Sequence, residues 1–312
     1  MLFPNDFIEE KIKVNGIEIN CKYGGNKESK IPLLLIHGYP QTHIMWYKIV
    51  TELSKKYFII CPDLRGYGDS SKPKGDENHI SYSKKTMAKD MIELMDYFGF
   101  DKFYVAGHDR GARVTHRMCL DYASRVLKAC VMDITPTYHM FKNTDQSFAT
   151  GYYHWFFLIQ GDNLPETLIG SNARYFLEEK LKRWSSKDAI FKEVFQENAV
   201  NEYVRCFDKQ SIHGTCEDYR AGASIDMSDD EKDRNKKIAM PLLVLWGNKG
   251  FVNRTYDVLN VWNEYASDVR GKSLDCGHFL AEEKPDDVCK ELIEFFSKII
   301  LFPKKFGNKN LA

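Results

Sequence analysis

The sequence predicts an α/β protein in which a mostly parallel sheet is covered by helices on both faces and carries an inserted helical domain. Short apolar runs bounded by Gly, Pro or Asp recur along the chain, and segments of helical period separate several of them. This alternation is typical of parallel sheets. It stops after Asp133 and resumes near Met240, and the chain between is aromatic-rich with no clear strand pattern. We therefore expect a helical cap at that point.

The individual elements follow from the same patterns. Residues 8–23 alternate in polarity around Asn15-Gly16, which is a hairpin signal. The strands after it are expected at residues 31–36, 57–61, 103–106, 129–132 and 242–246. Helices are expected over residues 83–98, 110–122 and 285–300. The predicted units are a core domain of residues 1–137 and 229–302, a cap of residues 138–228 and a basic tail of residues 303–312.

Composition narrows the class of protein. The chain has 312 residues, enough for one large α/β domain with an insertion. Lys and Arg total 44, as do Asp and Glu, which argues against a nucleic acid or a membrane surface as partner. Apolar runs such as residues 33–36 are too short to span a bilayer, and the start lacks the features of a signal peptide. The eight Cys show no zinc-type spacing, so we expect reduced thiols, no metal and a cytoplasmic location.

The segment Gly107-His108-Asp109-Arg110-Gly111 directly follows a predicted strand. A strand that enters a tight turn with small residues around a central acid has the form of the nucleophile elbow of α/β-hydrolases, with Asp109 where an esterase carries Ser. A carboxylate can displace a leaving group from an sp3 carbon and form an alkyl ester that water must then cleave. An Asp before a helix is also a common N-cap, but the strand and the flanking glycines favour a nucleophile.

A base and its acid partner are expected later in the chain, because hydrolases of this type follow the order nucleophile, acid, His. His278 lies on a loop before the last predicted helix and is expected to take a proton from water that attacks the ester. Asp133 lies at a strand end and is the favoured acid, with Asp275 or another acid as the alternative. The equivalent position after the next strand is Asn248, which cannot supply a charge.

Two further patterns concern the substrate and the developing charge. The loop His37-Gly38-Tyr39-Pro40 follows a predicted strand and matches the loop that supplies one oxyanion-hole donor. The expected donors are the backbone N–H groups of Tyr39 and Arg110. Arg110 and Arg113 lie one helical turn apart and can share a face above the nucleophile. Because Arg is the preferred fork for a carboxylate, the pair predicts an anionic substrate.

Two segments of the predicted cap, residues 152–157 and 217–220, are dense in ring N–H and O–H groups. Such donors suit a small anion in a dry pocket, although the same aromatic residues could form an apolar core. Phe156 and Phe157 are expected to serve the core.

With these motifs the chain, from about residue 7 to 302, resembles the fluoroacetate (haloacetate) dehalogenases of the α/β-hydrolase fold. The motifs that carry the resemblance are residues 37–43, 107–113, 133–137, 154–155, 218–222 and 267–269. The Arg pair after the nucleophile is the specific part, because haloalkane dehalogenases and many epoxide hydrolases resemble one another in placing Trp there.

The resemblance implies a role for each residue of the site. The implied roles are nucleophile for Asp109, base for His278, its acid partner for Asp133, carboxylate binding for Arg110 and Arg113, and halide binding for His154, Trp155 and Tyr219. The sequence leaves open whether Tyr153 contributes to the pocket. The resemblance also implies a homodimer that needs no metal or organic cofactor.

The resulting hypothesis is a hydrolytic dehalogenase that converts a short 2-haloacid, haloacetate and foremost fluoroacetate, to glycolate and halide through an Asp109 ester. The sequence does not distinguish release of fluoride from release of chloride or bromide. The alternative is an epoxide hydrolase with the same Asp109 and His278, in which cap tyrosines such as Tyr153 and Tyr219 protonate the epoxide; the Arg pair and the His-Trp pair of the cap argue against it. A third hypothesis is a receptor for a small ligand on a hydrolase scaffold.

Overall fold

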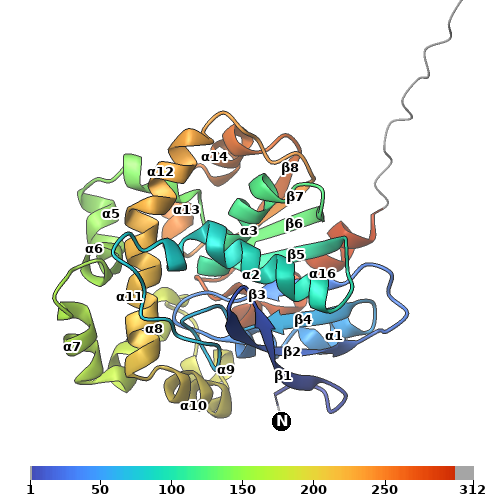
Figure 1. Cartoon of the computed structure of the whole chain (residues 1–312), viewed down its shortest axis with the longest axis horizontal. Coiled ribbons are helices and arrows are strands. Elements are labelled where there is room, and N and C mark those ends of the chain that lie inside the picture. Colours follow the sequence, from blue (N-terminus) through green and yellow to red (C-terminus); the bar gives the residue numbers. More distant parts are fainter. Residues whose placement is uncertain (1, 299–312) are drawn as a thin grey trace, which may run out of the picture.

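The computed structural model describes residues 2–298, in which a twisted sheet is covered by helices on both faces (Figure 1). The sheet of this part has eight strands in the order β1-β2-β4-β3-β5-β6-β7-β8. They are β1 (Ile8–Val14), β2 (Ile17–Gly25), β3 (Leu33–Ile36), β4 (Phe58–Pro62), β5 (Phe103–His108), β6 (Val126–Met132), β7 (Leu242–Gly247) and β8 (Val269–Leu274). Only the pairs β1/β2 and β2/β4 are antiparallel. The predicted mostly parallel α/β architecture is confirmed.

The strands form where the local sequence demands them. All four residues of β3 are buried, as expected for a strand with helices on both faces. Asn15 and Gly16 between β1 and β2 both have positive φ, +45° and +79°, which is the turn that the Asn-Gly signal predicted. Strand β8 was not predicted. It lies at the sheet edge with Arg270 and Lys272 exposed, so it has no apolar run, and pairing with β7 supplies its order.

The core helices surround this sheet. They are η1 (His43–Trp46), α1 (Val50–Ser54), η2 (Ile80–Tyr82), α2 (Lys84–Tyr97), α3 (Arg110–Asp121), α13 (Phe251–Thr255), α14 (Val258–Tyr265), α15 (Leu280–Glu283) and α16 (Pro285–Ser297). Helices α2 and α3 pack against each other, as do α1 and α16. The predicted helices at 83–98 and 110–122 are confirmed to within a residue or two. The last residues of the third prediction, 299–300, and the basic tail lie outside the described residues.

The chain between β6 and β7 is helical and contains no strand. Its helices are α4 (Thr137–Lys142), α5 (Gln146–Gly151), α6 (Tyr153–Leu158), α7 (Leu164–Gly170), α8 (Ala173–Trp184), α9 (Phe191–Val194), α10 (Glu197–Cys206), α11 (Lys209–Ala223) and α12 (Ile225–Lys232). Most of them gather beside the sheet, in green to gold in Figure 1, with the long α11 at the border. The predicted boundary between residues 228 and 229 falls inside α12.

No helix of the described chain combines the length and the apolar character that crossing a membrane requires.

The start of α3 depends on the absence of a side chain at Gly111. A Cβ there would lie 2.3 Å from the carbonyl oxygens of Ile36 and of His37, which are backbone atoms that cannot move aside. We predict that Gly111→Ala lowers the free energy of unfolding by about 2 kcal/mol or more, because the added methyl group overpacks this junction. Gly170→Ala, in open space at the end of α7, is the matched control and should change stability little. Urea unfolding of both variants measures the difference, and equal midpoints would contradict the prediction.

Candidate active site

Asp109 occupies the turn between β5 and α3 in a strained backbone conformation. Its φ is +47° and its ψ is −113°, a region that costs energy for any residue except Gly. The loop after β3 packs directly against it, since a Cβ on Gly38 would lie 2.5 Å from the Asp109 Cβ. The backbone N–H of Tyr39 donates to the Asp109 Oδ1 at 2.9 Å. This strained turn with its flanking glycines has the geometry of a nucleophile elbow.

The Asp109 carboxyl is buried yet favours its charged form. Burial by itself raises its pKa, but the nearby imidazole of His278 and the guanidinium groups of Arg113 and Arg110 outweigh burial. The net pKa lies below the ordinary value for Asp. An ionised carboxylate at neutral pH is the form that can act as a nucleophile.

His278 and Asp133 form the hydrogen-bonded pair that the chain order predicted. The His278 Nδ1 lies 2.6 Å from the Asp133 Oδ2, and the other Asp133 oxygen accepts the N–H of Gly247 at 3.0 Å. The backbone N–H of His278 donates to the Trp184 carbonyl at 2.8 Å, which fixes the loop. Because a carboxylate only accepts, Nδ1 carries the proton and Nε2 of the neutral ring is an acceptor. Nε2 is buried and has no partner among the described residues.

Burial lowers the pKa of His278, but the hydrogen bond to Asp133 and the charges of Asp133 and Asp109 more than offset it. The net pKa is raised above the ordinary value of 6.5. The ring therefore accepts a proton more readily than a free imidazole does, which suits a general base.

His108, the residue before the nucleophile, supports His278 from behind. Its Nε2–H donates to the His278 carbonyl at 2.7 Å, and the two ring centres lie 4.5 Å apart. Burial lowers the pKa of His108 to about 3, so this imidazole is neutral. The sequence predicts no role for His108, although its position in the elbow motif, directly before Asp109, was an available signal.

Arg110 has a protein partner that the sequence analysis did not foresee. Its Nε donates to one oxygen of Asp218 at 2.8 Å, and its Nη2 donates to the other at 2.6 Å and to the Asp218 carbonyl at 2.8 Å. The guanidinium also lies 4.2 Å from the ring centre of Tyr219. Asp218 is on α11 of the cap, so this bidentate pair joins the elbow to the cap.

The Asp218 carboxylate also accepts hydrogen bonds from two further residues of the core domain. Lys84 at the start of α2 donates to its Oδ1, and the Tyr67 hydroxyl donates to its Oδ2 at 2.7 Å. Burial alone would raise the pKa of Asp218, but Arg110 and Lys84 hold it well below its usual range. The Arg110 charge is therefore balanced inside the protein.

Arg113 differs from Arg110 because no carboxylate of residues 2–298 forms an ion pair with it. Its Nη1 donates to the Thr135 carbonyl at 3.1 Å and to the Thr137 hydroxyl at 2.9 Å, and its buried Nε has no partner. The guanidinium lies 4.6 Å from the ring centre of Trp155. Arg113 therefore brings an unbalanced positive charge to the site.

The three predicted halide ligands lie together in the cap wall. The His154 and Tyr219 ring centres are 5.6 Å apart, and those of Trp155 and Tyr219 are 6.3 Å apart. All three side chains are buried, and the His154 Nδ1 and the Tyr219 hydroxyl have no partner in the part of the chain described. Burial, and then the charge of Lys180, holds the pKa of His154 well below 6.5, so the ring is neutral.

Two further rings complete the wall. The ring centre of Trp184, which the sequence did not single out, lies 4.6 Å from that of His154 and 5.4 Å from that of His278. Tyr152 belongs to the donor-rich segment 152–157 named from the sequence, and its ring centre lies 5.1 Å from that of His154. Aromatic residues are common in helical cores, so the sequence held no signal to separate Trp184 from packing residues.

Tyr153 points away from this wall. Its side chain is 46% exposed, and its hydroxyl accepts a hydrogen bond from Lys180 at 2.8 Å. It lies outside the cluster of unpaired donors around Asp109.

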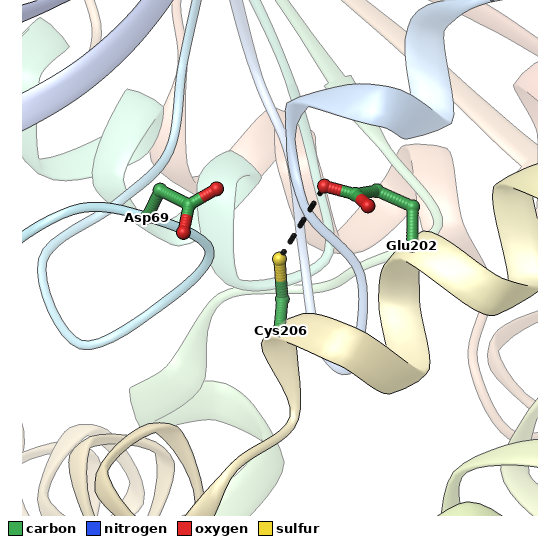
Figure 2. A group of neighbouring side chains, drawn as sticks. All are labelled: Asp69, Glu202 and Cys206. Atoms are coloured by element: carbon green, nitrogen blue, oxygen red, sulfur yellow. Dashed lines mark hydrogen bonds between the residues drawn. The ribbon is translucent and has the colours of Figure 1, made fainter.

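A separate group of ligand-type side chains, Asp69, Glu202 and Cys206, lies where α10 of the cap meets the loop after β4 (Figure 2). Arg205 already supplies a positive charge that balances these acids. It forms ion pairs with Asp69 and with Glu202 and donates to the Cys206 sulfur at 3.2 Å. This arrangement is an ion-pair cluster between cap and core, and it gives no reason to place a metal there.

Comparison with known proteins now identifies the family. The family model for the alpha/beta hydrolase fold matches residues 31–285. The chain belongs to the α/β-hydrolase family. The predicted fold is thereby confirmed.

Several relatives are similar along nearly their whole length. A fluoroacetate dehalogenase from Burkholderia sp is 40% identical over 292 residues, which cover 93% of this chain and 94% of that protein. A soluble epoxide hydrolase from Corynebacterium sp. (strain C12) is 31% identical over 292 residues, 92% of this chain and 96% of that protein. A solved structure from Nostoc sp PCC 7120, assigned to the α/β hydrolases, has a TM-score of 0.92 and 50% identity and covers 96% of this chain and 100% of that one. These matches confirm the resemblance to the haloacetate dehalogenases and the hydrolase class.

The hydrogen bond between Asp133 and His278 leads to a prediction that does not depend on the substrate. Asp133→Asn removes the negative charge beside the His278 Nδ1, so the imidazolium loses its main stabilisation and the His278 pKa should fall. An NMR titration of the His278 ring in wild type and in Asp133→Asn measures this shift. An unchanged or higher pKa in the variant would mean that Asp133 does not set the basicity of His278.

Proposed function

We propose that the protein hydrolyses the carbon–halogen bond of a short 2-haloacid, converting haloacetate to glycolate and halide. The observation that carries the proposal is a cluster of buried polar atoms without partners around an ionised Asp109. They are the Arg113 Nε, the His154 Nδ1, the Tyr219 hydroxyl, the Tyr39 hydroxyl and the His278 Nε2. Unpaired buried polar atoms are costly and are expected where a ligand completes them. Here donors and a positive charge surround a carboxylate nucleophile, which suits a small anion with a leaving group.

The first step is a displacement. Arg113, whose charge has no internal partner, binds the substrate carboxylate and places the α-carbon against Asp109. An Asp109 oxygen forms a bond to that carbon, and the carbon–halogen bond breaks with its electron pair remaining on the halide. His154, Trp155 and Tyr219 receive the halide and stabilise its charge as it develops.

The second step releases the product. His278 takes a proton through Nε2 from a water that attacks the Asp109 carboxyl carbon. The backbone N–H groups of Tyr39 and Arg110 stabilise the oxyanion. The Tyr39 N–H already donates a hydrogen bond to Asp109 in the structure. Collapse of this intermediate breaks the bond between the Asp109 carbonyl carbon and the ester oxygen. The departing alkoxide takes the proton from His278 and leaves as glycolate, and the Asp109 carboxyl loses its remaining proton to solvent, which restores the carboxylate.

Arg110 takes a more limited role in this proposal than the sequence analysis gave it. Asp218 engages its Nε and Nη2, so only Nη1 is left to reach a substrate. Arg110 therefore serves chiefly to join the elbow to the cap, and Arg113 supplies the charge that selects an anion.

Epoxide hydrolysis is the competing proposal, and the 31% identical epoxide hydrolase supports it. It needs cap hydroxyls that protonate the epoxide oxygen. Of the two tyrosines expected for this, Tyr219 has a buried hydroxyl without a partner among the described residues, whereas that of Tyr153 accepts a hydrogen bond from Lys180. A neutral epoxide carries no negative group for the guanidinium of Arg113 to bind. The homodimer implied by the resemblance and the cytoplasmic location remain predictions.

Halide release is the direct test. Fluoro-, chloro- and bromoacetate, measured side by side, should each yield halide and glycolate in equal amounts. His278→Asn should release at most one halide per active site and retain a carboxymethyl group on Asp109, because displacement needs no proton transfer whereas ester hydrolysis does. Halide analysis and intact mass give the readout, with Asp109→Asn as the control that is not alkylated. Diol formation from epoxides without halide release from any haloacetate would favour the competing proposal.

Charge selection is tested on Arg113. Arg113→Leu should cost on the order of 2–4 kcal/mol in transition-state binding, because the substrate carboxylate loses its partner in a desolvated site. The change is measured as kcat/KM for chloroacetate. Chloroacetamide, which has no charge, is the matched substrate and should gain nothing from Arg113. Equal use of chloroacetate and chloroacetamide by the wild type would refute this role.

A further inference from the structure

Lys180, on α8 of the cap, carries its ammonium group into the protein interior. The side chain is 3% exposed and is surrounded by aromatic rings. Its Nζ lies 4.0 Å from the ring centre of Tyr153, 5.0 Å from that of Phe176 and 5.2 Å from that of Trp184. Rings of this kind attract a cation through their faces.

This ammonium has no negative partner. Its hydrogen bond goes to the neutral Tyr153 hydroxyl, and within residues 2–298 no carboxylate forms an ion pair with it. The acids of its own helix, Glu178 and Glu179, pair with other basic residues. Burial, together with the like charge of Arg183, lowers the pKa of Lys180 to about 7. A buried Lys without a counter-ion is costly and uncommon in proteins.

The ammonium lies directly behind the predicted halide wall. One ring, Trp184, contacts both Lys180 and His154, with 4.6 Å between the Trp184 and His154 ring centres. Tyr153, which accepts the Lys180 hydrogen bond, is the chain neighbour of His154. Among charged groups, Lys180 has the largest effect in lowering the pKa of His154. Its positive field therefore crosses a single layer of rings, where little solvent is present to screen it.

We propose that Lys180 is a specificity-determining residue of the halide pocket, whose ammonium stabilises negative charge on the departing halogen from behind the His154 and Trp184 rings. The proposal rests on the proposed dehalogenase function. Lys180 does not touch the substrate and transfers no proton. A poor leaving group carries more of its final charge when the bond breaks, so fluoride depends on this field more than chloride does.

The test isolates the displacement step. In His278→Asn the ester is not hydrolysed, so intact mass follows alkylation of Asp109 alone and the titration of His278 does not interfere. Rates with fluoroacetate and chloroacetate are compared below pH 7, where Lys180 carries its charge, in His278→Asn by itself and combined with Lys180→Met, Lys180→Arg or Lys182→Met. Lys182 is the matched control, because it lies on the same helix but is 47% exposed and pairs with Glu178 and Glu179.

Lys180→Met should lower the ratio of the fluoroacetate rate to the chloroacetate rate by about ten-fold, as expected for one charge acting across a ring layer. Lys180→Arg, which keeps the charge, should retain most of the ratio, and Lys182→Met should leave it unchanged. Thermal unfolding shows which variants fold, and Lys180→Gln replaces Lys180→Met if the latter does not.

Three results would overturn the proposal in distinguishable ways. An equal fall of both rates would make Lys180 a packing residue of the cap, and two unchanged rates would leave it no part in halide departure; in both cases the dehalogenase function stands. If His278→Asn alone is alkylated by neither haloacetate, the proposed function fails and the role of Lys180 fails with it.

Discussion

The buried ion pair between Arg110 and Asp218 is the interaction on which the site depends. It connects the residue after the strained Asp109 turn to the longest cap helix, with both side chains almost wholly buried. Lys84 and Tyr67 also bind Asp218, so three core elements and the cap meet at one carboxylate. Buried pairs of this kind add little stability over an apolar contact, but losing one partner is costly. The pair therefore fixes how the cap closes over Asp109.

Because Asp218 balances the charge of Arg110, the other positive charges near the site have separate roles. Within residues 2–298, no carboxylate forms an ion pair with Arg113 on the core side of the site or with Lys180 behind the cap rings. Between them lie neutral donors, because burial keeps His154 uncharged. A substrate with a carboxylate at one end and a departing anion at the other would match this distribution. The electrostatics of the enclosure thus argue for a haloacid more strongly than the Asp–His machinery alone, which epoxide hydrolysis would also use.

Short-range patterns predicted most of the fold. The Asn15-Gly16 hairpin, the buried strand β3 and the elbow at Asp109 each follow from a few neighbouring residues. Strand β8 was not predicted, because its residues are mostly polar and its order comes from pairing with β7. The Trp184 ring was not predicted as part of the site because a ring in a cap helix has the same sequence pattern whether it faces a pocket or a core.

The sequence by itself determined the candidates for the proposed chemistry: the order of Asp109, Asp133 and His278, the loop at Tyr39 and the side chains of His154, Trp155 and Tyr219 all lie in local motifs. Only the tertiary structure decided how their charges are balanced. Asp218 stands 108 residues from Arg110 along the chain, whereas Lys180 and Arg113 have no carboxylate partner in the part of the chain that the structure describes. The physical reason is that the field at a site is the sum over every charge near it in space. Local sequence fixes the type of each side chain, and packing alone fixes which charges meet.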